Sequence, residues 1–136
     1  MALLLMVDDN PQSCRYVERI VQHRTAHKIV FASTSDEGIE KIVKRRPDLI
    51  FLDLFLPGMD GFELFELLRN HPATESIPIV VHTATPLDQV TELRMKKVRC
   101  EGFLEFPIEA SELNRVIDIA LQRNEISVQK WVPPSV

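Results

Sequence analysis

Short apolar runs alternate with amphipathic helical patterns from Leu3 to Leu121, and this alternation limits the possible folds more than any other feature. Such runs, bounded by polar or turn residues, are typical of strands buried on both faces of a parallel sheet. The five runs are residues 3–7, 28–32, 49–52, 79–81 and 102–106. Apolar residues at helical spacing follow each run. Because parallel strands need crossover connections, we expect helices on both faces of one sheet.

The expected fold class is therefore α/β, with five helices and a doubly wound five-stranded parallel sheet in the order 2-1-3-4-5. This is a flavodoxin-like arrangement. In this order the first strand is central and adjoins the third. Their carboxyl ends face one crevice, which is where ligands bind in open α/β sheets.

The fourth helical pattern is the least regular of the five. It predicts a helix from Leu87 to Arg99, and its apolar stripe leaves Met95 to one side. The stripe consists of Leu87, Val90, Leu93 and Val98. The basic stretch from Arg94 to Arg99, which Glu92 and Glu101 flank, is expected to be a solvated helix face; the alternative is a docking patch.

Acidic residues follow two strands that should be neighbours. Asp8 and Asp9 come directly after the first run, and Asp53 closes the third. These carboxylates should converge at one edge of the sheet, with Thr83 of the fourth strand beside them. Grouped carboxylates either keep a proton or bind a cation, and their hard oxygen atoms suit Mg²⁺, with Mn²⁺ as the alternative. His82 is expected to pack or to hydrogen-bond locally.

Four motifs in chain order carry a resemblance to a known family. They are LLLMVDDN, DLIFLDLFLPGMDGFEL, IPIVVHTAT and GFLEFPI. Together they resemble the response regulator receiver domain of two-component signalling, over about residues 2–124. The resemblance implies that Asp53 is the phosphoacceptor, that Asp9 binds Mg²⁺ directly and that Asp8 binds it mostly through water. It also implies that the backbone carbonyl of Phe55 is a further metal ligand.

The same resemblance implies a switch and an output surface. Thr83 would hydrogen-bond the phosphoryl oxygen, and Phe103 would be the aromatic residue that changes rotamer with it, although simple core packing of Phe103 is the alternative. The output surface would be the fourth helix, fifth strand and fifth helix. The implied partners are a sensor histidine kinase or a histidine phosphotransfer protein, a downstream protein target and, as a further option, a second copy of the chain. Such a domain is a self-catalysed phosphoacceptor and no turnover enzyme.

One position departs from the family pattern. Phe106 stands before Pro107 where the family has a lysine that pairs with the phosphoryl group. A degenerate receiver that binds a partner without phosphorylation is therefore the competing hypothesis. A Mg²⁺-dependent phosphohydrolase with an aspartyl nucleophile is less favoured. Such enzymes need a second acid two residues after the nucleophile, and that residue is Phe55.

Length and charge restrict the remaining function classes. The chain has 136 residues, a net charge of −4 and a pI near 5.6, which suits one domain and disfavours direct nucleic-acid binding. The apolar run before Asp8 is too short for a membrane span or signal peptide, and two cysteines without metal-ligand spacing suggest reduced thiols, so we expect a cytoplasmic protein. Residues 1–124 are expected to form the domain, and residues 125–136, with Trp131, a tail or the start of a linker.

Overall fold

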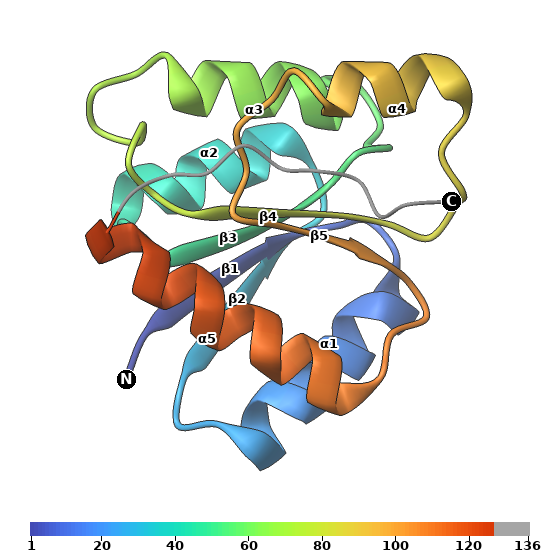
Figure 1. The fold of residues 1–136 in the computed structure, drawn as a ribbon. Helices are drawn as coiled ribbons and strands as arrows, with labels where there is room; N and C mark the ends of the chain where they lie inside the picture. The colour runs from blue at the N-terminus through green and yellow to red at the C-terminus, as the bar shows by residue number, and fades with distance from the viewer. Residues whose placement is uncertain (127–136) are drawn as a thin grey trace.

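The computed structural model describes residues 1–126 and confirms the predicted α/β architecture. Five parallel strands form one sheet in the order β2-β1-β3-β4-β5, and helices cover both of its faces (Figure 1). The strands are β1 (Leu3–Val7), β2 (Lys28–Ala32), β3 (Leu49–Asp53), β4 (Ile79–Thr83) and β5 (Gly102–Glu105). The helices are α1 (Pro11–Arg24), α2 (Ser35–Lys44), α3 (Gly61–Arg69), α4 (Gln89–Met95) and α5 (Ala110–Ile126).

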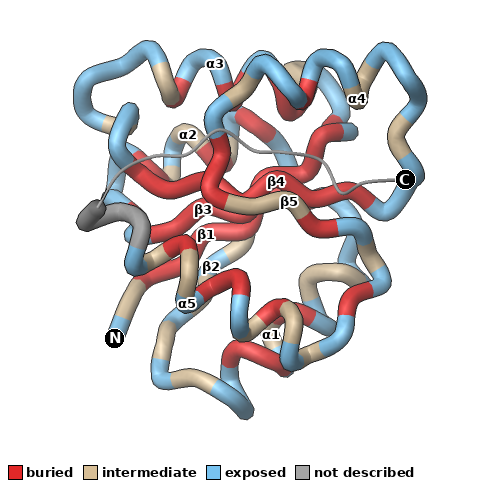
Figure 2. The backbone as a smooth tube through the Cα atoms, in the orientation of Figure 1, coloured by how far each residue is buried: buried red, intermediate tan, exposed pale blue. Residues whose placement is uncertain are grey.

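The sheet separates two apolar cores. Helices α2, α3 and α4 lie on one face, and α1 and α5 lie on the other (Figure 1). Every residue of β1, β3 and β4 is buried, and Figure 2 shows these strands as the buried centre of the molecule. The apolar runs are continuous because these strands are buried on both faces of a parallel sheet, as the sequence predicted.

Polar side chains start the helices that follow the first three strands. Asn10 caps α1, which begins at Pro11, while Thr34 caps α2 and Asp60 caps α3. In each case the side-chain oxygen accepts hydrogen bonds from backbone N–H groups of the first turn, which would otherwise lack partners. Each cap fixes the residue at which the loop ends and the helix begins.

The prediction for the fourth helix was wrong in both length and orientation. Helix α4 spans only Gln89–Met95, and Met95, which the predicted stripe excluded, is fully buried. Val90 and Leu93, which the stripe included, are 75% and 58% exposed. The stripe failed because its outer members lie beyond the helix ends, where a spacing of 3.6 residues has no meaning.

Strand β4 extends two residues beyond the predicted run and includes His82 and Thr83. In the register of the sheet, Asp53 pairs with His82 and Thr83 pairs with Glu105. This extension brings a histidine side by side with the carboxylate that closes β3.

Two further expectations concern the thiols and the tail. Both cysteines are free, and burial raises the pKa of Cys14 to about 11 and that of Cys100 to about 12, so both remain protonated near neutral pH. Residues 127–136, including Trp131, lie outside the described residues. Within residues 1–126, no helix combines the length and the apolar character that a membrane span requires.

Candidate functional site

Strand alternation places four side chains, those of Asp8, Asp53, His82 and Phe106, on one face of the sheet. Successive side chains of a strand point to opposite faces, so a residue shares its face with the one two positions earlier. The residues two positions before Asp8, Asp53, His82 and Phe106 are Met6, Phe51, Val80 and Leu104, all in the core beside α1 and α5. The carboxylates of Asp8 and Asp53 therefore meet the imidazole of His82 and the ring of Phe106 at this edge.

Asp8 is held by groups from three segments. Its backbone N–H donates to the carbonyl of Ala32 at 2.9 Å, and its Oδ1 accepts from the N–H of Asn10 at 2.8 Å. Its Oδ2 lies 3.0 Å from Nε2 of His82. Both side chains are almost fully buried. The orientation of Asp8 is therefore fixed before any ligand binds.

Asp53 is a largely buried carboxylate at the end of β3. Its Oδ1 accepts a hydrogen bond of 3.0 Å from the N–H of Phe55. Burial raises the pKa of Asp53 to about 6, and the charge on Asp8 also raises it, whereas the Phe55 N–H and His82 lower it. The ionised form of Asp53 is thus costly unless a cation or a donor compensates it.

The oxygen atoms at this edge fit a divalent cation. One ligand atom each from Asp8, Asp53 and His82 lie within 4.8 Å of one another. Two buried carboxylates side by side, one of them Asp53 with its raised pKa, are a donor set that a cation stabilises. Asp9 is exposed, and together with Phe55 it lines an adjacent hollow of about 380 Å³.

Thr83 and Phe103 lie on the other face of the sheet. Thr83 is fully buried, and its hydroxyl accepts from the N–H of Thr85 at 3.1 Å and donates to the carbonyl of the same residue at 2.9 Å. Phe103 is partly buried and packs against the core beside α2, α3 and α4. In this state the hydroxyl of Thr83, the predicted phosphoryl contact, therefore faces the loop that follows β4. Phe103, the predicted switch aromatic, contacts the core.

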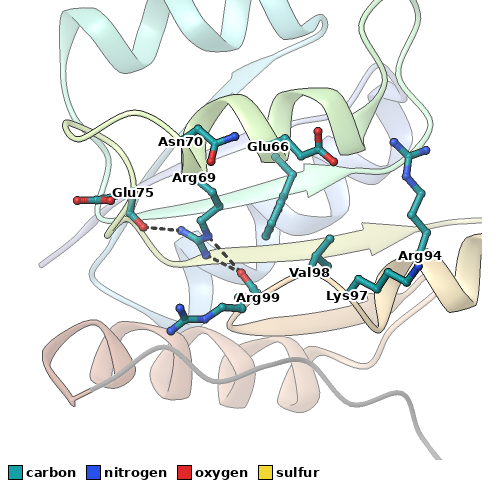
Figure 3. A pocket seen from close by; sticks show the side chains of 9 residues that line it. Glu66, Arg69, Asn70, Glu75, Arg94, Lys97, Val98 and Arg99 are labelled. Atoms are coloured by element: carbon teal, nitrogen blue, oxygen red, sulfur yellow. Dashed lines mark hydrogen bonds between the residues drawn. The ribbon is translucent and has the colours of Figure 1, made fainter.

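A second hollow, of about 420 Å³, lies between α3 and the segment around α4 (Figure 3). It carries several cationic side chains, but Arg69 uses all five of its N–H donors within the protein. Figure 3 shows two of its acceptors, the carbonyls of Glu75 and Arg99. This hollow is built around a structural arginine, and it lies away from the carboxylates of the candidate site.

Comparison with known proteins decides the family. A family profile described as the response regulator receiver domain matches residues 4–118. This chain is a response regulator receiver domain. It therefore belongs to a family that acts in two-component signalling, as the four motifs indicated.

Relatives of different lengths share this domain. The receiver is 30% identical over 124 residues to the transcriptional regulatory protein AfsQ1 of Streptomyces coelicolor, covering 91% of this chain and 52% of AfsQ1. It is 25% identical over 122 residues to protein PilH of Pseudomonas aeruginosa, covering 89% of this chain and 98% of PilH. The chain thus spans about half the length of AfsQ1 and nearly all of PilH.

Solved structures agree on the fold. A putative response regulator from Chloroflexus aurantiacus has a TM-score of 0.81 at 29% identity, covering 90% of this chain and 98% of its own. The receiver domain of a sensor histidine kinase from Pseudomonas aeruginosa, solved with a magnesium ion coordinated in the active-site cleft, has a TM-score of 0.78 at 22% identity and covers 89% and 98%. The second likeness supports the fold alone.

His82 is the residue of the receiver site that sequence reasoning undervalued. The expectation that it packs or hydrogen-bonds locally is confirmed for packing, since its ring stacks on Phe106, but its hydrogen-bond partner Asp8 lies 74 positions away. The register of the sheet pairs Val80 with Phe51, and strand alternation then places His82 on the same face as Asp53. The sequence alone does not report this register.

Replacement of Asp53 by asparagine is expected to stabilise the metal-free receiver above pH 6. The folded state raises the pKa of Asp53 from 3.8 to about 6, so this carboxyl favours folding fully below pH 4 and loses that contribution as pH rises through 6. Urea unfolding in metal-free buffer should show a gain of about 1–2 kcal/mol at pH 7.5, discounted for partial exposure, and little gain at pH 4. Asp118→Asn, an exposed change on α5, is the control, and an equal gain at both pH values would contradict the argument.

Proposed function

We propose that this receiver accepts a phosphoryl group on Asp53 from a phosphohistidine donor. The observation that carries the proposal is the position of Asp53, a buried carboxylate with a raised pKa beside Asp8 at the carboxyl edge of the sheet. A carboxylate in this setting can act as a nucleophile toward phosphorus. In the transfer, an oxygen of Asp53 forms a bond to phosphorus, the bond from phosphorus to the donor's imidazole nitrogen breaks, and that nitrogen keeps the electron pair.

Mg²⁺, with Mn²⁺ as the alternative, would be held by Asp8, Asp9 and Asp53, with the backbone carbonyl of Phe55 as a further ligand. The ion would neutralise negative charge on the phosphoryl oxygens. The chain's own residues do the positioning: Asn10 and His82 orient Asp8, and the N–H of Phe55 orients Asp53.

Phosphorylation would act through protein partners. The donor would be a sensor histidine kinase or a histidine phosphotransfer protein, and the output would pass through α4, β5 and α5 to a downstream protein or a second copy of the chain. Val90 and Leu93 on α4 are exposed apolar side chains, which suit protein docking. Thr83 would leave Thr85 to contact the phosphoryl group, and Phe103 would follow. We assign no metabolite turnover to the protein, and we place it in the cytoplasm.

The second candidate function is a phosphate-independent interaction module. Phe106 favours it, because its ring brings no charge to the place where the family has a lysine. Both functions use the same fold and the same exposed α4 surface, so only the chemistry of Asp53 separates them.

The test is the intact mass of the protein after incubation with acetyl phosphate and Mg²⁺. We expect the wild-type protein to gain one phosphoryl group, and Asp53→Asn to gain none. Circular dichroism of both samples serves as the control for folding. A folded wild-type protein that gains no mass with acetyl phosphate, or with a phosphorylated histidine phosphotransfer domain, would favour the interaction module.

A further inference from the structure

We propose that His82 supplies the hydrogen-bond donor for the phosphoryl group on Asp53, in place of the lysine that Phe106 replaces. The proposal rests on the proposed function and names a further positioning residue of the same site. It comes from three observations: the place of His82 in the sheet, the direction of its Nε2–H, and the contact of its ring with Phe106.

The side chain of His82 lies within reach of a phosphoryl group on Asp53. It is 1% exposed, it pairs in register with Asp53, and its side chain lies on the same face of the sheet. Ligand atoms of Asp8, Asp53 and His82 lie within 4.8 Å of one another. A small rotation of the imidazole therefore carries its donor from one carboxylate to a group bound on the other.

The hydrogen bond to Asp8 shows which ring nitrogen is the donor. An ionised carboxylate only accepts hydrogen bonds, so Nε2 of His82 carries the proton in the 3.0 Å contact with Asp8 Oδ2. Among residues 1–126, the buried Nδ1 has no hydrogen-bond partner, which is less costly for a lone pair than for an N–H group. The donor is thus already aimed at the acidic edge of the sheet.

Phe106 fixes the plane of this imidazole. The two rings stack with centroids 5.0 Å apart and an angle of 27° between their planes. The backbone N–H of Phe106 donates to the carbonyl of Thr83 at 2.8 Å, which ties the residue to β4 beside His82. The aromatic side chain that removes the family's lysine therefore also holds the histidine in place. Arg94, which lines the hollow beside Asp9 and Phe55, lies over the ring of Phe62, with its Cζ atom 4.0 Å from the ring centroid. We therefore do not assign it the role of the lysine.

In the proposed step, His82 gives a hydrogen bond and keeps its proton. As the bond between Asp53 and phosphorus forms and the bond to the donor's leaving group breaks, negative charge is spread over the phosphoryl oxygens. The Nε2–H then bonds one of these oxygens and releases Asp8. Because hydrogen bonds to charged groups are strong in a buried site, loss of this donor should slow the transfer by about tenfold or more.

The test uses a matched pair of amide substitutions with acetyl phosphate and Mg²⁺ as the phosphorylation system. His82→Gln places an amide N–H near the position of Nε2, whereas His82→Asn places it near Nδ1. We expect His82→Gln to retain most of the wild-type phosphorylation rate and His82→Asn to lose about tenfold. The double variant His82→Asn/Phe106→Lys should regain the rate, because the lysine restores a donor. The ³¹P chemical shift of the Asp53 phosphoryl group should change in His82→Asn and recover in the double variant.

The outcomes separate this proposal from the proposed function. A wild-type protein that is not phosphorylated overturns both. A phosphorylated wild type with an unchanged rate and an unchanged ³¹P shift in His82→Asn overturns the role of His82 alone. Equal losses in the Gln and Asn variants show a structural role only and also overturn it, whether or not Phe106→Lys raises the rate. If His82→Asn does not fold, the rate of His82→Gln decides: retention of most of the wild-type rate supports the donor role, and a loss of about tenfold overturns it.

Discussion

Replacement of Arg69 by methionine is expected to lower the free energy of unfolding by about 3–5 kcal/mol. The guanidinium of Arg69 donates to Glu101 Oε1 at 2.6 Å and to the carbonyl of Ile77 at 2.7 Å, and its remaining donors bind the carbonyls of Glu75 and Arg99 (Figure 3). It therefore joins α3 to the loops that enter β4 and β5. Without it, the carboxylate of Glu101, whose side chain is 1% exposed, would lose its cation.

Urea unfolding measures this loss, and the chain offers a matched control. Arg115 forms an ion pair of 2.7 Å with Glu112, but both side chains are about half exposed, at 59% and 46%. Arg115→Met should change stability little, because water solvates both charges. Glu101→Gln in the Arg69→Met background should recover part of the loss by removing the unpaired charge. A loss below about 1 kcal/mol for Arg69→Met would contradict the assigned role of the pair.

Replacement of Gly61 by alanine is expected to cost about 3 kcal/mol and to displace Asp53. A Cβ atom at Gly61 would lie 2.3 Å from the carbonyl oxygen of Asp53 and 2.6 Å from Cα of Leu54. Both atoms belong to the backbone, so no flexible side chain can move aside. The start of α3 would have to shift away from the end of β3, which carries the phosphoacceptor.

Gly58→Ala is the control for this substitution. Gly58 has φ of 78°, which L-residues adopt at a cost, but no atom of the described chain lies within 4 Å of a Cβ placed there. It should lose only about 1 kcal/mol in urea unfolding, and it should retain phosphorylation by acetyl phosphate. Equal losses in the two glycine variants would show that the close approach at Gly61 matters no more than backbone conformation.

The fold could be predicted because its main determinants are periodic and local. Short apolar runs between helical stripes leave a doubly wound sheet as the solution, and the handedness of crossovers restricts the strand order. The convergence of Asp8 and Asp53 followed from that order and is confirmed by the structure. Helix α4 was predicted, but with the wrong bounds and the wrong buried side, because Met95, its buried residue, belongs to no repeated apolar stripe.

The long-range polar contacts of the structure could not be predicted from local sequence patterns. Glu101 was expected to flank a solvated basic face, yet it is 3% exposed and bonds the N–H of Ile79 and the guanidinium of Arg69. Its partners lie 22 and 32 positions away in the chain. The bond from His82 to Asp8 has the same character. Such pairs depend on strand register and on which loops meet, and one sequence carries no period that reports them.

The most direct test of the central claim is to locate the phosphoryl group. The protein is incubated with acetyl phosphate and Mg²⁺, reduced with sodium borohydride, which converts an aspartyl phosphate to homoserine, and then digested for peptide mass spectrometry. We predict homoserine at position 53, and unmodified aspartate at Asp8, Asp9 and Asp60. Unmodified Asp53 in a folded protein that carries the phosphoryl group on another acid would contradict the account.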